Sequence, residues 1–262
     1  RHAIAATAGW RVRMEDAHAV AAPVAPGAAC SLFAVFDGHG GSLVANYAAA
    51  HVARCVRESP GWATAVASGF AEPAAVGAAL AEALEALDDE LRTHPRLAPS
   101  RRAGRSADAP LVAEDESGAT ALLVAVTRTH VVAAHLGDSR AVACSRDAAG
   151  AWACDALTPA DHSPADAAEA ARCAACPGCG VLSEAGDVPR VCRTADDGSP
   201  KRDGAVQTSR ALGDFVFKPA GVEAPAVSRT ADVSVRALSD VFAGGPRPGV
   251  VRRARSRRRR DP

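Results

Sequence analysis

Aromatic side chains are scarce in this sequence, which has one Tyr, three Trp and six Phe in 262 residues. Alanine dominates the hydrophobic fraction, a bias that GC-rich codon usage explains as readily as a structural demand. No apolar run reaches the about 20 residues of a membrane-spanning helix, and no secretory-type leader opens the chain. These absences predict a globular protein with no membrane partner, in the cytoplasm or the nucleus.

An initiator Met is also lacking, because the sequence begins at Arg1, and we expect the natural N-terminus and any targeting segment to be missing. The length fits one large domain or two small ones with a sizeable core. Eight cysteines without a secretion signal favour a reducing compartment.

The end of the chain is strongly basic, with an Arg-rich stretch from Arg252 to Arg260. A reading-frame or exon error in a GC-rich gene would produce such Pro, Arg and Gly codons. The alternative is a genuine tail for nucleic-acid binding or nuclear import. Because aromatics for base stacking and a nucleic-acid-binding fold are lacking, we favour the error and expect no nucleic acid partner. We expect a domain over 1–242 and a disordered tail over 243–262.

The stretch Leu32–Gly41 combines a short apolar run with the residues Asp-Gly-His-Gly-Gly. The run predicts a buried strand, which would hold Asp37 rigidly at its carboxyl end. Gly38 has no side chain, so that its carbonyl can approach a hard cation. His39 titrates near neutral pH, which suits proton transfer. A plain turn is the alternative, since Asp and Gly are common turn residues.

Five further motifs accompany this stretch in a fixed order. The six motifs are GWRVRMEDAH at 9–18, DGHGG at 37–41, SGATA at 117–121, LGDSRAV at 136–142, LTPADH at 157–162 and SRALGD at 209–214. Together they resemble the signature motifs of the metal-dependent protein serine/threonine phosphatases of the PP2C (PPM) family, from about Gly9 to about Lys218.

The resemblance implies an α+β fold, in which two antiparallel β-sheets pack as a central sandwich flanked by α-helices. It implies hydrolysis of phosphoserine and phosphothreonine in proteins by a water that two Mg²⁺ or Mn²⁺ ions activate. Phosphorylated proteins are the implied partners, and we expect a monomer. Nothing in the sequence resembles the Cys-x5-Arg loop of cysteine-dependent phosphatases.

By the same resemblance, the metal ions are shared by Asp37 and supported by the Gly38 carbonyl, Glu15 and Asp16. Asp161 inherits the role of a ligand to an additional ion. Outside the family context, the neighbouring charges at 13–16 would be a solvated surface.

Two further roles follow from the resemblance. Arg11 clamps the substrate phosphate, a task that suits the planar fork of a guanidinium. His39 protonates the leaving serine or threonine oxygen, and Asp37 is counted with these two as catalytic. Asp138 is expected to lie close to the metal centre, although it could instead be a plain acid in a turn. Asp214 is expected to lie on the side of the active site.

The resemblance breaks near the C-terminus. The family continues into Asp-Gly-x-Trp-Asp and Gly-x-x-Asp-Asn motifs, each of which supplies a metal-binding aspartate, and neither occurs in this sequence. Smaller departures are His135 in place of Asn and Ser163 in place of Lys. The competing hypothesis is therefore a catalytically inactive, phosphatase-like interaction module.

The hydrophobic periodicity predicts the remaining elements. We expect a first strand over 3–10, helices over 43–56, 76–91 and 166–172, a loop at Pro60-Gly61, and a mobile insertion over 93–116. Strands are expected over 119–126, 130–136, 140–144 and 152–157.

Cys173, Cys176 and Cys179 form a doubled Cys-x-x-Cys spacing, which raises the hypothesis of a structural zinc. Such a site needs four ligands, so Cys192 or His162 would have to complete it. We favour a local elaboration of the fold over zinc.

Overall fold

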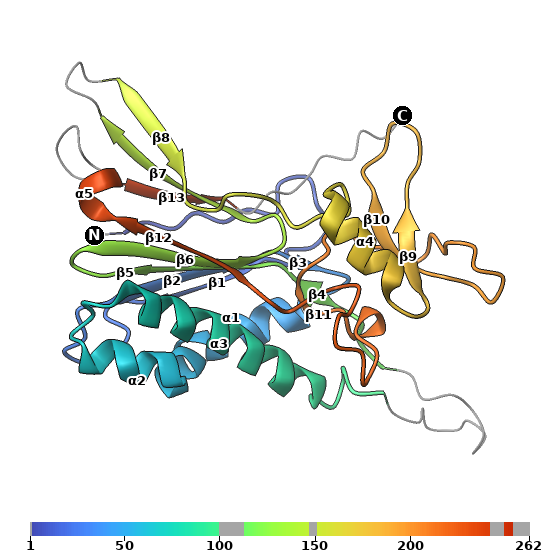
Figure 1. Cartoon of the computed structure of the whole chain (residues 1–262), viewed down its shortest axis with the longest axis horizontal. Helices are drawn as coiled ribbons and strands as arrows, with labels where there is room; N and C mark the ends of the chain where they lie inside the picture. Colours follow the sequence, from blue (N-terminus) through green and yellow to red (C-terminus); the bar gives the residue numbers. More distant parts are fainter. Residues whose placement is uncertain (1, 100–112, 147–150, 242–248, 254–262) are drawn as a thin grey trace.

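The computed structural model describes residues 2–99, 113–146, 151–241 and 249–253. Their centre is an antiparallel sheet of five strands in the order β1-β2-β5-β6-β12 (Figure 1). The middle strand β5 is almost entirely buried because both faces of the sheet are covered, whereas β2 alternates between buried and half-buried residues. The strands are β1 (Ala17–Ala21), β2 (Ser31–Phe36), β5 (Ala121–Val126), β6 (His130–Leu136) and β12 (Asp232–Ala237).

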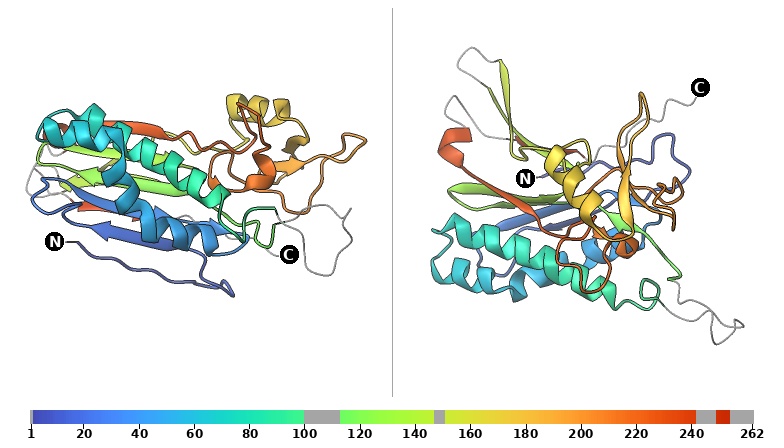
Figure 2. Two further views of the ribbon diagram at one scale, coloured as in Figure 1. Left: turned by 90° about the horizontal axis from the view of Figure 1, so that it is seen from below. Right: turned by 45° about the vertical axis from the view of Figure 1, so that its right-hand side comes forward.

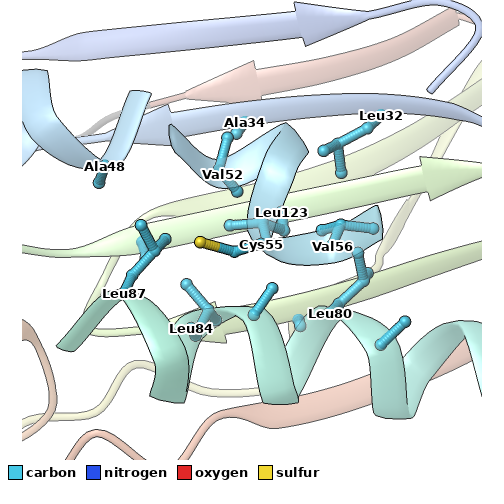
Figure 3. Packing of buried hydrophobic residues seen from close by; sticks show 14 of the residues in the cluster. Leu32, Ala34, Ala48, Val52, Cys55, Val56, Leu80, Leu84, Leu87 and Leu123 are labelled. Atoms are coloured by element: carbon cyan, nitrogen blue, oxygen red, sulfur yellow. The ribbon is translucent and has the colours of Figure 1, made fainter. Parts of the chain in front are cut away.

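Three helices cover one face of this sheet: α1 (Leu43–Glu58), α2 (Pro60–Ala67) and α3 (Pro73–Arg92) (Figures 1 and 2). Leucines of α3 pack on α1 and on the sheet, where the small side chains of Ala34 and Ala48 allow a close approach (Figure 3). The core of this layer is thus built mainly from Leu, Val and Ala, in line with the few aromatic residues of the sequence.

A second sheet lies on the opposite face, in the order β13-β7-β8. Its strands are β7 (Arg140–Arg146), β8 (Trp152–Ala156) and β13 (Gly249–Arg253), and the short helix α5 (Leu238–Val241) packs beside it. A separate buried cluster joins the two sheets, with members from β5, β6, β7 and α5. The expected α+β sandwich of antiparallel sheets with helices is therefore confirmed, with α1, α2 and α3 on one side.

Smaller elements gather at one end of the sandwich, at the right of Figure 1. The sheet β11-β4-β3 joins three short strands that are far apart in the sequence. The pair β9-β10 lies beside α4. The bounds are β3 (Gly38–His39), β4 (Gly118–Ala119), β11 (Leu212–Gly213), α4 (Ala167–Ala175), β9 (Cys179–Leu182), β10 (Arg190–Arg193) and the 3-10 turn η1 (Phe215–Phe217).

The helices predicted from periodicity are confirmed as α1, α3 and α4, and the later strands as β5 to β8. Two expectations were wrong. Residues 3–10 form no strand, and the first strand is β1, after the acids. Pro60 opens helix α2 rather than a loop, because Ser59 caps the helix and a proline at the first helical position needs no hydrogen-bonded N–H.

Two predicted segments lie partly outside the described residues. Of the expected insertion at 93–116, residues 100–112 fall outside them. Of the expected tail at 243–262, only 249–253 are described, and their backbone pairs with β7 as strand β13. Within the described residues, no helix is long and apolar enough to cross a membrane.

Candidate metal and phosphate site

Asp37 lies between β2 and β3, where its backbone is fixed on both sides. Its carbonyl accepts a hydrogen bond from the Thr120 N–H at 3.0 Å, and its own N–H donates to the Thr120 Oγ1 at 3.4 Å. The Thr120 hydroxyl is in turn 2.7 Å from the Ser139 Oγ, and both side chains are buried. A rigid hydroxyl pair therefore sets the position of Asp37 at the end of the sheet.

Two other aspartates, Asp16 and Asp138, lie close enough to Asp37 to change its pKa. Burial, followed by the charges of Asp16 and Asp138, raises the pKa of Asp37 to about 7. Burial likewise raises the pKa of Asp16, while the hydrogen bond to Asp37 and the charge of Arg11 act in the opposite direction. The end of β2 thus concentrates negative charge that a cation would neutralise.

Gly38 brings the two N-terminal motifs together. A Cβ at this position would lie 2.3 Å from the Glu15 carbonyl oxygen and 3.2 Å from the Cβ of Ala45. Any side chain would push these segments apart, so the glycine is needed for this close approach. The structure therefore brings the backbone of Glu15 next to Gly38 and places Asp16 close to Asp37, while their role in metal binding stays a prediction.

Arg11 lies in an exposed turn close to Asp16. Its N–H donates to the Ala8 carbonyl at 3.0 Å, and its guanidinium is close enough for its charge to lower the pKa of Asp16. The flanking side chains of Trp10 and Val12 are also exposed. Arg11 is therefore accessible to a ligand that approaches the acids.

His39 is held by Asp214, which follows β11. The His39 Nε2 and the Asp214 Oδ2 are 2.8 Å apart, and Asp214 is buried. Burial by itself lowers the pKa of His39, but the charge and the hydrogen bond of Asp214, together with the charges of Asp37 and Glu15, raise the pKa above its ordinary value. The imidazole is thus favoured in its protonated form, as an acid that donates a proton requires.

Asp161 has a different environment from Asp37. Its two oxygens accept hydrogen bonds from the Nε and Nη2 of Arg140, both at 2.6 Å. Such a bidentate pair occupies the carboxylate, whereas Asp138 acts directly on the pKa of Asp37. A role for Asp161 in metal binding stays a prediction.

The donors at Asp37 suit a hydrated Mg²⁺ or Mn²⁺ better than a fully caged ion. Among the described residues, no group of three or more His, Cys, Asp or Glu side chains is arranged to hold a metal. Mg²⁺ keeps several waters, however, and often binds through one or two carboxylates and a substrate phosphate. The neighbouring carboxyl groups of Asp37 and Asp16 fit that mode.

The cysteines of the zinc hypothesis do converge, in a buried cluster. Burial, followed by the nearby thiols of Cys176, Cys173 and Cys192, raises the pKa of Cys179 to about 12. Within the part of the chain that the structure describes, these cysteines do not form a group that could hold a metal ion. Apolar packing with Val191 and Phe217 accounts for the burial of these thiols.

The buried residues that fix the backbone of the site were not predicted from the sequence. Thr120 and Ser139 lie in quoted motifs, but their hydrogen bond to each other joins two different strands. Asp88, on α3, forms a buried ion pair with Lys218 at 2.7 Å. An acid on the apolar stripe of α3 was the available signal for Asp88.

The fold and the site define a class, namely α+β sandwiches of antiparallel sheets with a carboxylate cluster at one end. The family model described as "Protein phosphatase 2C" matches residues 1–241. The chain therefore belongs to the protein phosphatase 2C family of protein serine/threonine phosphatases.

Individual relatives agree with this assignment. The chain is 31% identical to protein phosphatase 1B of Rattus norvegicus over 222 residues, which cover 83% of this chain and 48% of the relative. It is 34% identical to the probable protein phosphatase 1N of Homo sapiens over 243 residues, or 91% and 46% of the two chains. The chain thus spans about half the length of these relatives.

Solved structures show the same fold. The serine-threonine phosphatase 2C from Toxoplasma gondii superposes with a TM-score of 0.67 at 22% identity, covering 87% of this chain and 70% of that one. A C. elegans sex determining protein gives a TM-score of 0.58 at 24% identity, with coverages of 87% and 46%.

Proposed function

We propose that this chain is a phosphatase domain that hydrolyses phosphoserine and phosphothreonine in proteins and depends on Mg²⁺ or Mn²⁺. The observation that carries the proposal is the juxtaposition at the end of β2. An acidic cluster that favours a cation, an exposed arginine and a histidine with a raised pKa lie together there. Family membership supports the reaction type.

Asp37 and Asp16 would hold the ion, with the Gly38 carbonyl nearby. When bound, the ion neutralises charge on the phosphoryl group and makes a bound water more acidic. Arg11 donates hydrogen bonds to the phosphate oxygens and fixes the orientation of the phosphate. His39 gives a proton to the leaving serine or threonine oxygen as the P–O bond breaks, and the electron pair of that bond stays with the oxygen. The attacking water supplies the proton that restores the imidazolium.

The test is the release of phosphate from a phosphothreonine peptide at increasing Mn²⁺ concentrations. Asp37→Asn retains the shape of the side chain but removes its charge, and we expect it to abolish the stimulation by Mn²⁺. Glu223→Gln makes the same chemical change at an exposed position and should leave the rate unchanged. Equal rates for the wild type and Asp37→Asn would contradict the proposed function.

One observation favours the second candidate, a phosphatase-like binding module. The described residues contain no complete group of three metal ligands, which predicts weak metal binding and a low rate. A module of this kind would bind the phosphothreonine peptide through Arg11 without hydrolysing it. Peptide binding that is lost in Arg11→Ala, together with no phosphate release at any Mn²⁺ concentration, would identify the module.

A further inference from the structure

We propose that Asp214 is a positioning residue for His39: it holds the ring through Nε2, so that Nδ1 is the nitrogen that meets the substrate. The role in turnover rests on the proposed function, whereas the orientation of the ring is a property of the chain itself. No motif of the sequence links these residues, which are 175 positions apart.

The contact between His39 and Asp214 joins a partly exposed side chain to a buried one. The Asp214 side chain is 2% exposed and that of His39 is 31% exposed, so the pair runs from the interior towards the surface. In the proposed arrangement, the His39 Nε2–H donates to the Asp214 Oδ2 at 2.8 Å, because a carboxylate oxygen is a hydrogen-bond acceptor. With Nε2 engaged, Nδ1 is the ring nitrogen left for a leaving oxygen.

The backbone around Asp214 is built to hold this carboxylate. Asp214 has a φ of 52°, in the left-handed region that Asp and Asn tolerate better than most residues. Its N–H donates to the Ser117 carbonyl at 3.2 Å, and the Phe217 N–H donates to its carbonyl at 2.9 Å. A Cβ on Gly118 would lie 2.3 Å from the Asp214 Oδ2, so only a glycine leaves room for the carboxylate.

A second buried contact fixes the whole segment to α3. Asp88 Oδ1 accepts hydrogen bonds from the Gly213 N–H at 2.9 Å and from the Lys218 Nζ at 2.7 Å. Lys218 also donates to the Ala211 carbonyl at 2.9 Å. The residues on both sides of Asp214 are thus attached to one helix, and this rigidity is what a positioning residue needs.

Two variants separate positioning from folding. Asp214→Asn is nearly isosteric, tolerates the left-handed backbone and removes the charge. Asp214→Gly also suits that backbone and removes the side chain altogether. Both are compared with the wild type and with Glu223→Gln as the matched surface control.

The first readout depends on the leaving group. Hydrolysis of phosphothreonine releases the threonine oxygen as an alkoxide that needs a proton, whereas hydrolysis of p-nitrophenyl phosphate releases p-nitrophenolate, a stable anion that does not. We expect kcat on the phosphothreonine peptide to fall at least about 10-fold in both variants, and kcat on p-nitrophenyl phosphate to change less than about 3-fold. Equal losses on both substrates would mean a structural role and overturn the proposal.

The second readout is independent of activity. In the metal-free chain, at a pH high enough for the His39 ring to be neutral, ¹⁵N NMR of the histidine rings should show the one remaining ring proton on Nε2 in the wild type. This preference should be lost in Asp214→Gly, while unchanged ring signals would overturn the proposal. If the wild type hydrolyses neither substrate, the proposed function fails, and the NMR result still decides whether Asp214 orients His39.

Discussion

Replacement of Lys218 by Met should destabilise the fold strongly through an effect on Asp88. Lys218 is 3% exposed and Asp88 is fully buried, and their charged atoms are 2.7 Å apart. Met has a similar length but removes the positive charge, which leaves the Asp88 carboxylate buried without its counter-ion. Breaking a buried pair in this way costs about 3–5 kcal/mol of unfolding free energy.

For a domain of this size, that loss lowers the melting temperature by roughly 6–20 °C. Differential scanning calorimetry of the two proteins measures it. The double variant Lys218→Met, Asp88→Leu removes both charges and should recover part of the loss, because no unpaired charge remains. A melting temperature for Lys218→Met within about 2 °C of the wild type would refute the reasoning.

Three further predictions concern the site itself. Gly38→Ala should abolish metal-dependent activity and lower the melting temperature, because its Cβ would meet the Glu15 carbonyl oxygen at 2.3 Å; calorimetry and phosphate release test this. Arg11→Ala should raise KM for a phosphopeptide about 10-fold with no loss of stability, since the side chain is exposed; unchanged steady-state kinetics would contradict it. The pKa of Asp37 is raised to about 7 from 3.8, so the folded state binds more protons and the unfolding free energy falls as pH rises through that window. Urea unfolding in EDTA should therefore show the unfolding free energy of Asp37→Asn rising by about 1–2 kcal/mol relative to that of the wild type as the pH goes from 5 to 8. The same relative change in Glu223→Gln would rule this out.

The part of the site that lies close together in the sequence could be predicted from the sequence. Asp37, Gly38 and His39 follow one apolar run, and the change from strand to glycine-rich turn marks them directly. Glu15 and Asp16 could be joined to them only through the resemblance to a family. The physical reason for their proximity, the missing Cβ at Gly38, becomes visible only in three dimensions.

Contacts between distant segments could not be predicted. The pairing of His39 with Asp214 depends on β3 and β11 both joining β4, and strand order does not follow from local periodicity. The contact of Asp161 with Arg140 is a second example, because the two residues come from different motifs of the sequence.

Local sequence patterns predicted the wrong secondary structure at two places where contacts with distant residues determine it. The apolar residues at 3–10 have the composition of a strand, but they pair with no neighbour and leave Ile4 half exposed. Pro60 and Gly61 look like a turn. Yet Ser59 caps the helix that starts there, and Gly61 lies so close to α3 that a Cβ would be 2.5 Å from the Ala79 nitrogen.

The metal site is tested most directly by a Mn²⁺ titration of the chain, monitored by electron paramagnetic resonance of the free ion. We expect the wild type to bind Mn²⁺ and Glu223→Gln to bind it equally well. Asp37→Asn should bind at least about 10-fold more weakly, because it removes the central carboxylate of the acidic cluster. Equal Mn²⁺ affinities for Asp37→Asn and the wild type would contradict the claim that this cluster is a metal site.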